Sequence, residues 1–232
     1  MTCQIGNELN TVVRGALTFP FPPAKSITVL DLCLAPGGFS TAVLRHNPRH
    51  DVSLYGITLP IKMGGYEVRI PNWNTDPRIA DIKFLDITML SGEMGLSYSD
   101  IPASHPDKNN FIAERPFPDK QFDLIFCGGT VVRNHAQTRS EYRNHHEGTR
   151  LLTSQLVLAL ERIRPGGTMV VVLHRADTWA NVALFHLFSK FSNVGKMQLF
   201  KPKRAHARKG SFYMVVRGVQ PRDMAAVEAV EN

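Results

Sequence analysis

The sequence has few cysteines and no long hydrophobic run. Cys3, Cys33 and Cys127 are scattered along 232 residues, which excludes a disulfide framework and a closely spaced cysteine metal site. A reduced, intracellular protein, cytoplasmic or nuclear, is the simplest interpretation. No stretch approaches the ~20 apolar residues of a membrane-spanning helix, and the first twenty residues contain no signal-peptide core. We therefore expect no membrane partner.

Charge is moderate, and the composition is that of an ordinary globular protein. Hydrophobic residues make up 43% and charged residues 20%, which excludes the disordered and fibrous classes. The net charge of +7 attracts polyanions such as nucleic acid, although many soluble proteins carry a similar charge. The length fits one continuous core. We expect a helix and Pro-rich linker at 1–23, a single domain at 24–218 and a frayed tail at 219–232.

Short apolar runs alternate with segments of helical periodicity, which is typical of βαβ units. Strands are predicted at 26–34, 51–58, 81–85, 122–127 and 168–173, and helices at 1–17, 39–46, 139–163 and 179–191. The last helix but one is expected to stop at Pro165-Gly166-Gly167. Segments 196–200 and 211–217 predict a hairpin at one sheet edge, and the polar segments 62–74 and 88–120 predict loops with short helices.

The first predicted strand runs into a glycine turn, DLCLAPGGFS, at residues 31–40. Open α/β sheets bind ligands at such a turn, because glycines let the backbone approach a ligand and the next helix offers free N–H groups. The turn is neither GxGxxG nor a P-loop, so nucleotide phosphates are poor candidates. A tight turn without any ligand remains the alternative.

The whole string resembles motif I of the FtsJ-like (RrmJ-type) RNA ribose 2′-O-methyltransferases, and segments 156–173 and 201–216 resemble later parts of that family. The resemblance implies a Rossmann-like α/β fold, with a mostly parallel doubly wound sheet and an antiparallel last strand, and S-adenosylmethionine as cofactor. It implies that the methionine part of the cofactor is contacted by Asp31, Ala35, Pro36, Gly37, Gly38 and Phe39. It places Asp86 near the adenine, and Thr58 at the ribose, where the family has an acid. Gly128, after the fourth strand, is a further cofactor contact.

The family activates its acceptor with a lysine, aspartate, lysine, glutamate tetrad, and this sequence departs from it. Gly128 or Gly129, Val172 and Ser211 stand at three tetrad positions, and Lys25 is too close to the first strand to be the first lysine. Substitute candidates at the same sheet edge are His174, Arg175 and Asp177, and Arg133, Asn134 and His135. The alternative interpretation for His135, His145 and His146 is a solvated helix start, and with no partner at zinc-ligand spacing no metal is expected.

A basic run follows the predicted penultimate strand. Lys201, Lys203, Arg204, Arg208 and Lys209 match a basic loop of the family and are predicted to contact RNA phosphates, with a solvated hairpin loop as the alternative. The leading hypothesis is an RNA methyltransferase that uses S-adenosylmethionine. A catalytically inactive relative that binds the cofactor or RNA, and a methyltransferase for a small molecule or a protein, remain alternatives.

Overall fold

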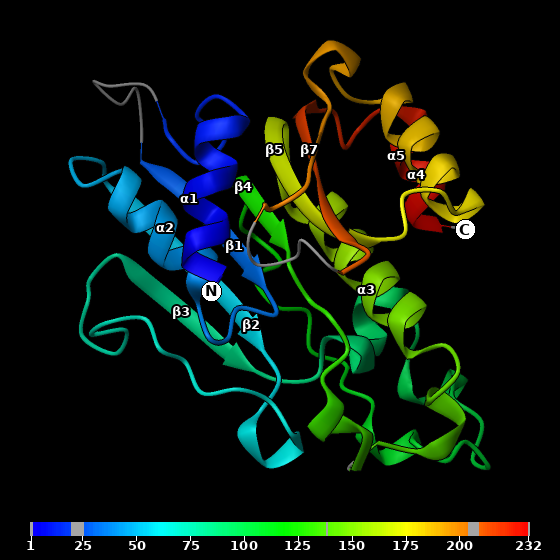
Figure 1. Ribbon diagram of the computed structural model, residues 1–232. Helices are drawn as coiled ribbons and strands as arrows, with labels where there is room; N and C mark the ends of the chain where they lie inside the picture. The colour runs from blue at the N-terminus through cyan, green and yellow to red at the C-terminus, as the bar shows by residue number, and fades with distance from the viewer. Residues whose placement is uncertain (1, 20–25, 138, 204–208, 232) are drawn as a thin grey trace.

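A computed structural model describes residues 2–19, 26–137, 139–203 and 209–231 (Figure 1). Within them, seven strands form one sheet in the order β3-β2-β1-β4-β5-β7-β6. The strands are β1 (Ile27–Leu32), β2 (Val52–Thr58), β3 (Ile79–Phe84), β4 (Phe122–Cys127), β5 (Ile163–His174), β6 (Gln198–Phe200) and β7 (Ser211–Val219). The first five are mutually parallel, and β7 runs antiparallel to both β5 and β6. The predicted doubly wound sheet with an antiparallel last strand is confirmed.

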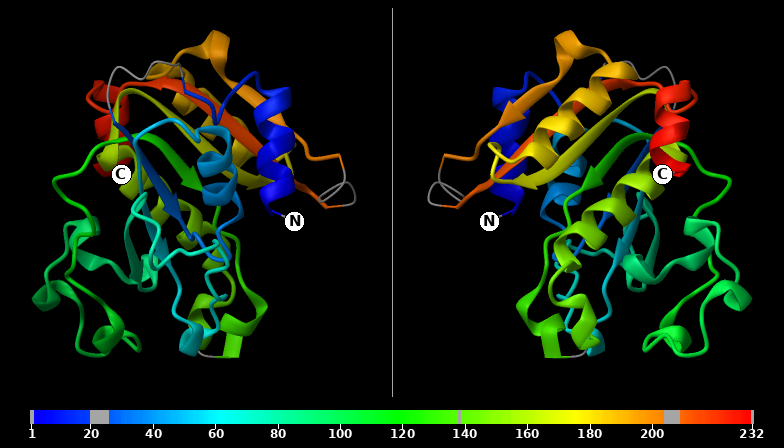
Figure 2. Two further views of the ribbon diagram at one scale, coloured as in Figure 1. Left: turned by 90° about the vertical axis from the view of Figure 1, so that its left-hand side faces the viewer. Right: turned by 90° about the vertical axis from the view of Figure 1, so that its right-hand side faces the viewer.

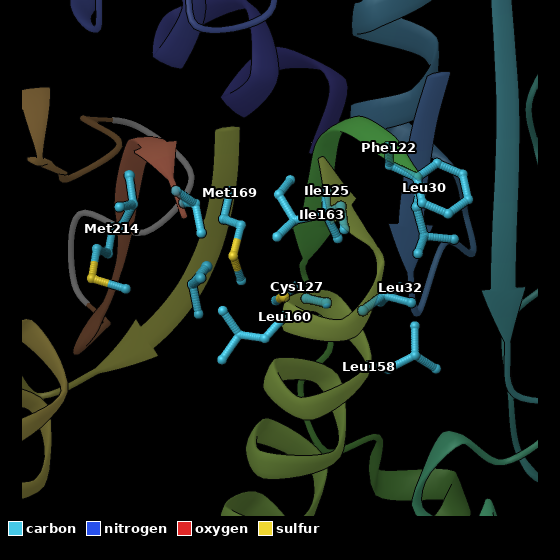
Figure 3. Packing of buried hydrophobic residues seen from close by; sticks show 14 of the residues in the cluster. Leu30, Leu32, Phe122, Ile125, Cys127, Leu158, Leu160, Ile163, Met169 and Met214 are labelled. Atoms are coloured by element: carbon cyan, nitrogen blue, oxygen red, sulfur yellow. The ribbon is translucent and has the colours of Figure 1, made fainter. Parts of the chain in front are cut away.

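Helices cover both faces of the sheet (Figure 2). The helices are α1 (Thr2–Val12), α2 (Gly38–His46), α3 (Glu147–Arg162), α4 (Trp179–Lys190) and α5 (Met224–Glu231). Because side chains alternate along a strand, Val29 joins a buried cluster with α1 and α2, whereas Leu30 joins one with α3, α4 and α5. Figure 3 shows Leu158 and Leu160 of α3 in this second cluster.

Two predicted boundaries around α3 are wrong. The helix begins at Glu147 and not at 139, because the chain before it makes a separate 3₁₀ turn over Glu141–Arg143 that buries the Arg143 side chain. At the other end β5 follows the helix directly, so the Pro165-Gly166-Gly167 segment lies inside the strand. A register shift between Phe122 and Leu124 of β4 accommodates that segment.

The C-terminal segment was expected to fray, and this expectation is also wrong. Residues Met224–Glu231 form α5, whose Ala226 is fully buried in the cluster that contains α3 and α4. At the N-terminal end, α1 stops at Val12, earlier than predicted, because Arg14 and Gly15 adopt left-handed φ angles of 44° and 74°. The proline run at 20–23 lies outside the described residues.

Two long connections, 87–120 and 130–146, lie beyond the carboxyl ends of the parallel strands (Figure 1). They consist of loops and short 3₁₀ turns, as predicted for the first of them. Asp107 joins the two connections, because its carboxylate accepts hydrogen bonds from the Ser140 hydroxyl at 2.6 Å and the Tyr142 hydroxyl at 2.8 Å. A buried ion pair of 2.5 Å between Glu93 and Arg162 joins the first connection to α3. These bonds fix a wall beside the sheet edge.

Candidate functional site

A cavity opens at the carboxyl ends of the parallel strands, where the strand order reverses between β1 and β4. It encloses about 680 Å³ of empty space, counting its open mouth. Each of the first four strands contributes lining at or just after its end: Ala35, Thr58, Asp86 and Gly128. The connection 130–146 supplies the far wall through residues such as Val132 and His135, and the connection 87–120 contributes Ile87. The carboxyl ends of parallel strands, at the point where the strand order reverses, are where open α/β sheets bind their ligands.

The glycine turn after β1 is packed by the chain itself. Gly37 has φ +93°, and a Cβ there would stand 2.3 Å from Ile70 Cγ1. A Cβ on Gly38 would stand 2.3 Å from Thr2 Cβ, at the start of α1. The Pro36 carbonyl accepts a hydrogen bond from Arg69 N at 2.9 Å. Pro36, Gly37 and Gly38 therefore lie against the 62–74 loop and α1, and the residues of this turn that line the cavity are Cys33 and Ala35.

Asp31 and Phe39 lie behind the cavity wall. Asp31 is 2% exposed, and the Ser40 hydroxyl donates a hydrogen bond of 2.6 Å to its Oδ2. Burial raises the pKa of Asp31 to about 7, although the Ser40 hydrogen bonds oppose the shift. The ring of Phe39 stacks on Phe126 with centroids 5.0 Å apart and meets Tyr213 edge-on at 5.5 Å. Both residues hold the turn in place from the core side.

A buried charged cluster forms the wall at Asp86. Asp86 Oδ1 accepts hydrogen bonds from Thr88 N at 3.0 Å and from its hydroxyl at 2.8 Å, and Oδ2 accepts one from Arg143 Nη2 at 3.1 Å. Arg143 also donates to both carboxylate oxygens of Glu147, at 2.9 and 2.6 Å. His135 Nε2 is 3.7 Å from Asp86 Oδ2. Two carboxylates thus share one arginine at the base of the cavity.

The electrostatics of this cluster follow from burial and pairing. Burial alone would lower the pKa of Arg143, but its bonds to Glu147 and Asp86 raise it well above the usual range, so the arginine is always charged. Burial lowers the pKa of His135, against the pull of Asp86 in the other direction. Burial also raises the pKa of the Cys33 thiol, which lines the cavity, so that thiol stays protonated and unreactive. The wall therefore combines a permanently charged arginine with an imidazole whose protonation is disfavoured by burial.

The sequence did not identify His135, Arg143 and Glu147 as members of one site. The solvated helix start proposed for His135 is wrong, because this residue is 6% exposed and lines the cavity. The one available signal was the four-residue spacing of Arg143 and Glu147, which matches an ion pair along a helix. Nothing in the sequence places these residues opposite Asp86. The side chains of Arg133 and Asn134 lie outside what the structure describes.

Of the other catalytic candidates, His174 is the last residue of β5, Arg175 and Asp177 follow it, and all three are exposed. They lie outside the described lining of this cavity. His174 Nδ1 is 3.1 Å from the Ser211 hydroxyl, and burial together with the Lys201 charge lowers the pKa of His174. Val172, at a tetrad position, is buried and pairs with Tyr213 across the β5 and β7 ladder.

The basic run lies between β6 and β7. Lys201 donates from its ammonium to the carbonyls of Lys209 and, at 2.9 Å, of Ser211. Lys203 and Lys209 are exposed, and the Lys203 backbone N–H donates to Glu8 of α1 at 2.9 Å. Arg204 and Arg208 lie outside the described residues. The run therefore stands at the carboxyl end of β5, because His174 pairs with Ser211 at the start of β7.

Neither a metal cluster nor a membrane span is found in the ranges described above. No three histidine, cysteine, aspartate or glutamate side chains of these ranges gather closely enough to hold a metal ion. No helix within them combines the length and apolarity needed to cross a bilayer.

Comparisons with known proteins agree with this geometry. The model of the FtsJ-like methyltransferase family matches residues 16–219. No curated protein sequence matches the chain closely enough to count as a relative. Among solved structures, a protein described as a ribosomal RNA methyltransferase from Plasmodium falciparum is similar, with a TM-score of 0.56, 15% identity, and coverage of 94% of this chain and 97% of that one.

Two further structures share the fold. Human methyltransferase-like protein 13, solved in complex with S-adenosylhomocysteine, has a TM-score of 0.51 and 11% identity, over 99% of this chain and 93% of its own. A class I S-adenosylmethionine-dependent methyltransferase from Listeria monocytogenes also has a TM-score of 0.51 and 11% identity, over 93% of this chain and 59% of its own. At such low identity these likenesses show the fold alone.

Proposed function

The chain belongs to the FtsJ-like methyltransferase family, and from this membership we propose that it binds S-adenosylmethionine in the cavity at the carboxyl ends of β1 to β4 and methylates RNA. The observation that carries the proposal is the convergence of Ala35, Thr58, Asp86 and Gly128, from four separate strands, on that one cavity. A nucleoside with an attached amino acid needs polar groups spread over several strand ends, and this cavity provides them.

The residues present fit such a cofactor in distinct ways. Asp86 lies 3.1 Å from Arg143 in a buried ion pair, and the family resemblance assigns to this position the carboxylate near the adenine. Thr58 Oγ1 accepts a hydrogen bond from Ala35 N at 3.3 Å, which leaves its own proton available to a ribose hydroxyl. Ile57, Leu85 and Leu151 supply apolar lining for a planar base. The bound cofactor supplies an activated methyl group, and the chain binds and orients it.

RNA as the acceptor is supported by charge. The net charge of +7 favours a polyanion, and the exposed Lys203 and Lys209 lie near the carboxyl end of β5, a strand parallel to those that end at the cavity. The Plasmodium structure described as a ribosomal RNA methyltransferase shares the fold over nearly the whole chain. The ribose 2′-hydroxyl is the acceptor that the family resemblance indicates.

One observation favours a second candidate function, cofactor or RNA binding without methyl transfer. Gly128 or Gly129 stands at one position of the family's catalytic tetrad, and Val172, which is 4% exposed within the core, stands at another. Neither side chain can take or give a proton. The remaining polar group at such a position is the Ser211 hydroxyl, which already contacts His174.

Cofactor binding is tested by calorimetric titration with S-adenosylhomocysteine. We choose Gly128→Phe as the blocking variant, because a Cβ at Gly128 meets only Phe39 carbons at 3.7 Å, so the change fills the cavity without breaking the turn. Gly148→Ala on α3 is the matched control, since its Cβ would make only an ordinary contact with Val131 Cγ2 at 4.0 Å. We expect binding by the wild type and by the control, and its loss in Gly128→Phe at an unchanged Tm. No heat of binding with the wild type would contradict the proposal.

Catalysis is tested separately by transfer of a tritiated methyl group from S-adenosylmethionine to total RNA. Incorporation that disappears in Gly128→Phe supports the methyltransferase. Binding of S-adenosylhomocysteine without incorporation into RNA, at stoichiometric enzyme, would instead support the non-catalytic relative.

A further inference from the structure

A second hollow lies at the far edge of the sheet, away from the cofactor cavity. We call it the edge groove, and its lining residues are Ala176, Leu199, Phe200, Lys201, Gly210 and Phe212. The turn between β5 and α4 contributes Ala176 to its lining, and the β6 and β7 hairpin contributes the other five residues. A hydrogen bond of 3.0 Å from Arg175 N to the Gly210 carbonyl ties the two sides together. The groove is therefore a built feature of the fold, with a largely apolar lining.

Trp179 stands at the end of the same turn, as the first residue of α4. It is 82% exposed, and Leu199 of the groove is 54% exposed. The turn is rigid, because Asn181 Nδ2 donates to the His174 carbonyl at 2.7 Å and to the Arg175 carbonyl at 2.8 Å. An exposed indole on a rigid element keeps a large apolar area in contact with water, which is unfavourable. Such apolar exposure marks an interaction surface.

The charge around this apolar surface is positive. Arg175, Lys201, Lys203 and Lys209 are exposed at the same edge. Two acidic residues lie near them, Asp177 in the turn and Glu8 of α1. The Glu8 carboxylate accepts the hydrogen bond from the Lys203 backbone N–H. The surface thus combines a stacking ring, an apolar groove and an excess of cations, which are the three parts that bind unpaired nucleic acid.

We propose that the edge groove and Trp179 bind a single-stranded segment of RNA, with a base stacked on the indole and the phosphates beside Lys203 and Lys209. The inference rests on the proposed RNA substrate and adds that the bound segment is unpaired. A duplex keeps its bases stacked inside and is recognised mostly through its phosphates and hydroxyls, so no base face is free to stack on an exposed indole. An unpaired segment exposes the planar faces that this surface accepts.

Fluorescence of Trp179 tests the contact directly. The sequence contains two tryptophans, and Trp73 is partly buried near Phe84, so Trp73→Phe leaves Trp179 as the sole indole. We expect its emission to be quenched, with saturation, by a single-stranded uridine 12-mer. A 12-base-pair RNA duplex, heparin and polyglutamate should leave the emission nearly unchanged. Equal quenching by polyglutamate or heparin would show a general polyanion surface, or a docking site for an acidic protein, and would overturn the proposal.

Affinity measurements on the otherwise wild-type protein complete the test. Trp179→Ala is expected to weaken binding of the 12-mer by roughly 5- to 150-fold, the range measured when base-stacking aromatics are replaced by alanine, and Trp179→Phe should restore most of it. Met224→Ala on α5 is the control, because Met224 is equally exposed, at 78%, but belongs to a different surface. An unchanged affinity of Trp179→Ala for the 12-mer would contradict the inference.

The two proposals fail separately. If S-adenosylhomocysteine binds and RNA is methylated while Trp179→Ala behaves as wild type, only the edge groove assignment is wrong. If the oligonucleotide quenches Trp179 but no S-adenosylhomocysteine binds, the groove assignment stands and the proposed cofactor site is wrong.

Discussion

Arg143 donates a hydrogen bond of 3.1 Å to Asp86, and both side chains are almost completely buried beside the cavity at the strand ends. The same arginine binds Glu147, so its removal leaves two buried carboxylates without their counter-charge. We expect Arg143→Met to lower the free energy of unfolding by about 3–5 kcal/mol, the cost of breaking a buried pair. Urea denaturation measures the change.

A surface ion pair provides the control for Arg143→Met. Arg78 and Asp76 are 2.6 Å apart, with side chains 38% and 14% exposed, so Arg78→Met should cost less than about 1 kcal/mol. If the two arginine variants lost the same unfolding free energy, burial of the Asp86 cluster would not explain the cost of Arg143→Met.

Much of the sheet was predictable, because its strands are buried apolar runs and the helices between them have clear periodicity. The predicted 122–127 strand and the observed Phe122–Cys127 strand coincide for this reason. The α3 start was not predictable, since residues 139–146 carry the composition of a helix and only the partner of Arg143, far away in sequence, decides their turn. The place of His135 in the cavity wall was not predictable for the same reason. Local patterns report periodicity, whereas a polar site is made by contacts between distant segments.

The glycine turn illustrates a different limit. The sequence correctly predicted Gly37 in a turn after the first strand, whereas Gly38 begins α2. The need for glycine at both positions was attributed to a ligand. In the structure Ile70 and Thr2 fill the space that a Cβ would take. Both neighbours come from segments whose positions no local pattern reveals.

Gly37→Ala should therefore destabilise the protein through a clash as well as through backbone strain. Gly37 and Gly166 have similar φ angles of +93° and +84°, but a Cβ at Gly166 meets nothing within 4 Å. We expect Gly166→Ala to cost roughly 1 kcal/mol and Gly37→Ala roughly 2–4 kcal/mol. The excess should shrink in an Ile70→Ala background, as a double-mutant cycle of unfolding free energies would show. Equal costs at the two glycines would contradict the clash.

Asp107 is expected to control the wall built by the two long connections. Burial alone would raise its pKa, but hydrogen bonds from Ser140, Asn110 and Tyr142 hold that pKa below its usual range. Asp107→Ala removes these bonds, so amide hydrogen exchange in the wall should accelerate by roughly tenfold or more while the central strands stay protected. Asp119→Ala, at an exposed aspartate, is the control. Uniform acceleration across the sheet would show that Asp107 supports the whole fold instead.

Asp31 gives the stability an unusual pH dependence. Its pKa rises from 3.8 when unfolded to about 7 in the buried site, so between these values the folded protein binds a proton that the unfolded chain has lost. The unfolding free energy must then fall as pH rises through this window, by up to about 4 kcal/mol, and level off above pH 7. Asp31→Asn cannot ionise, and its amide oxygen still accepts the Ser40 hydrogen bond. We expect the unfolding free energy of the variant to rise steadily relative to that of the wild type between pH 4 and pH 7.

The measurement is the difference between the two unfolding curves at each pH, because the other titrating groups, including Glu93, contribute equally to both proteins and cancel. Ser40→Ala supplies an independent check. The Ser40 hydroxyl stabilises the charged carboxylate, so its loss should raise the pKa of Asp31 further and extend the falling phase to higher pH. Parallel curves for wild type and Asp31→Asn from pH 4 to pH 8 would mean that the buried carboxyl has the same proton affinity folded and unfolded. Burial would then not dominate its environment.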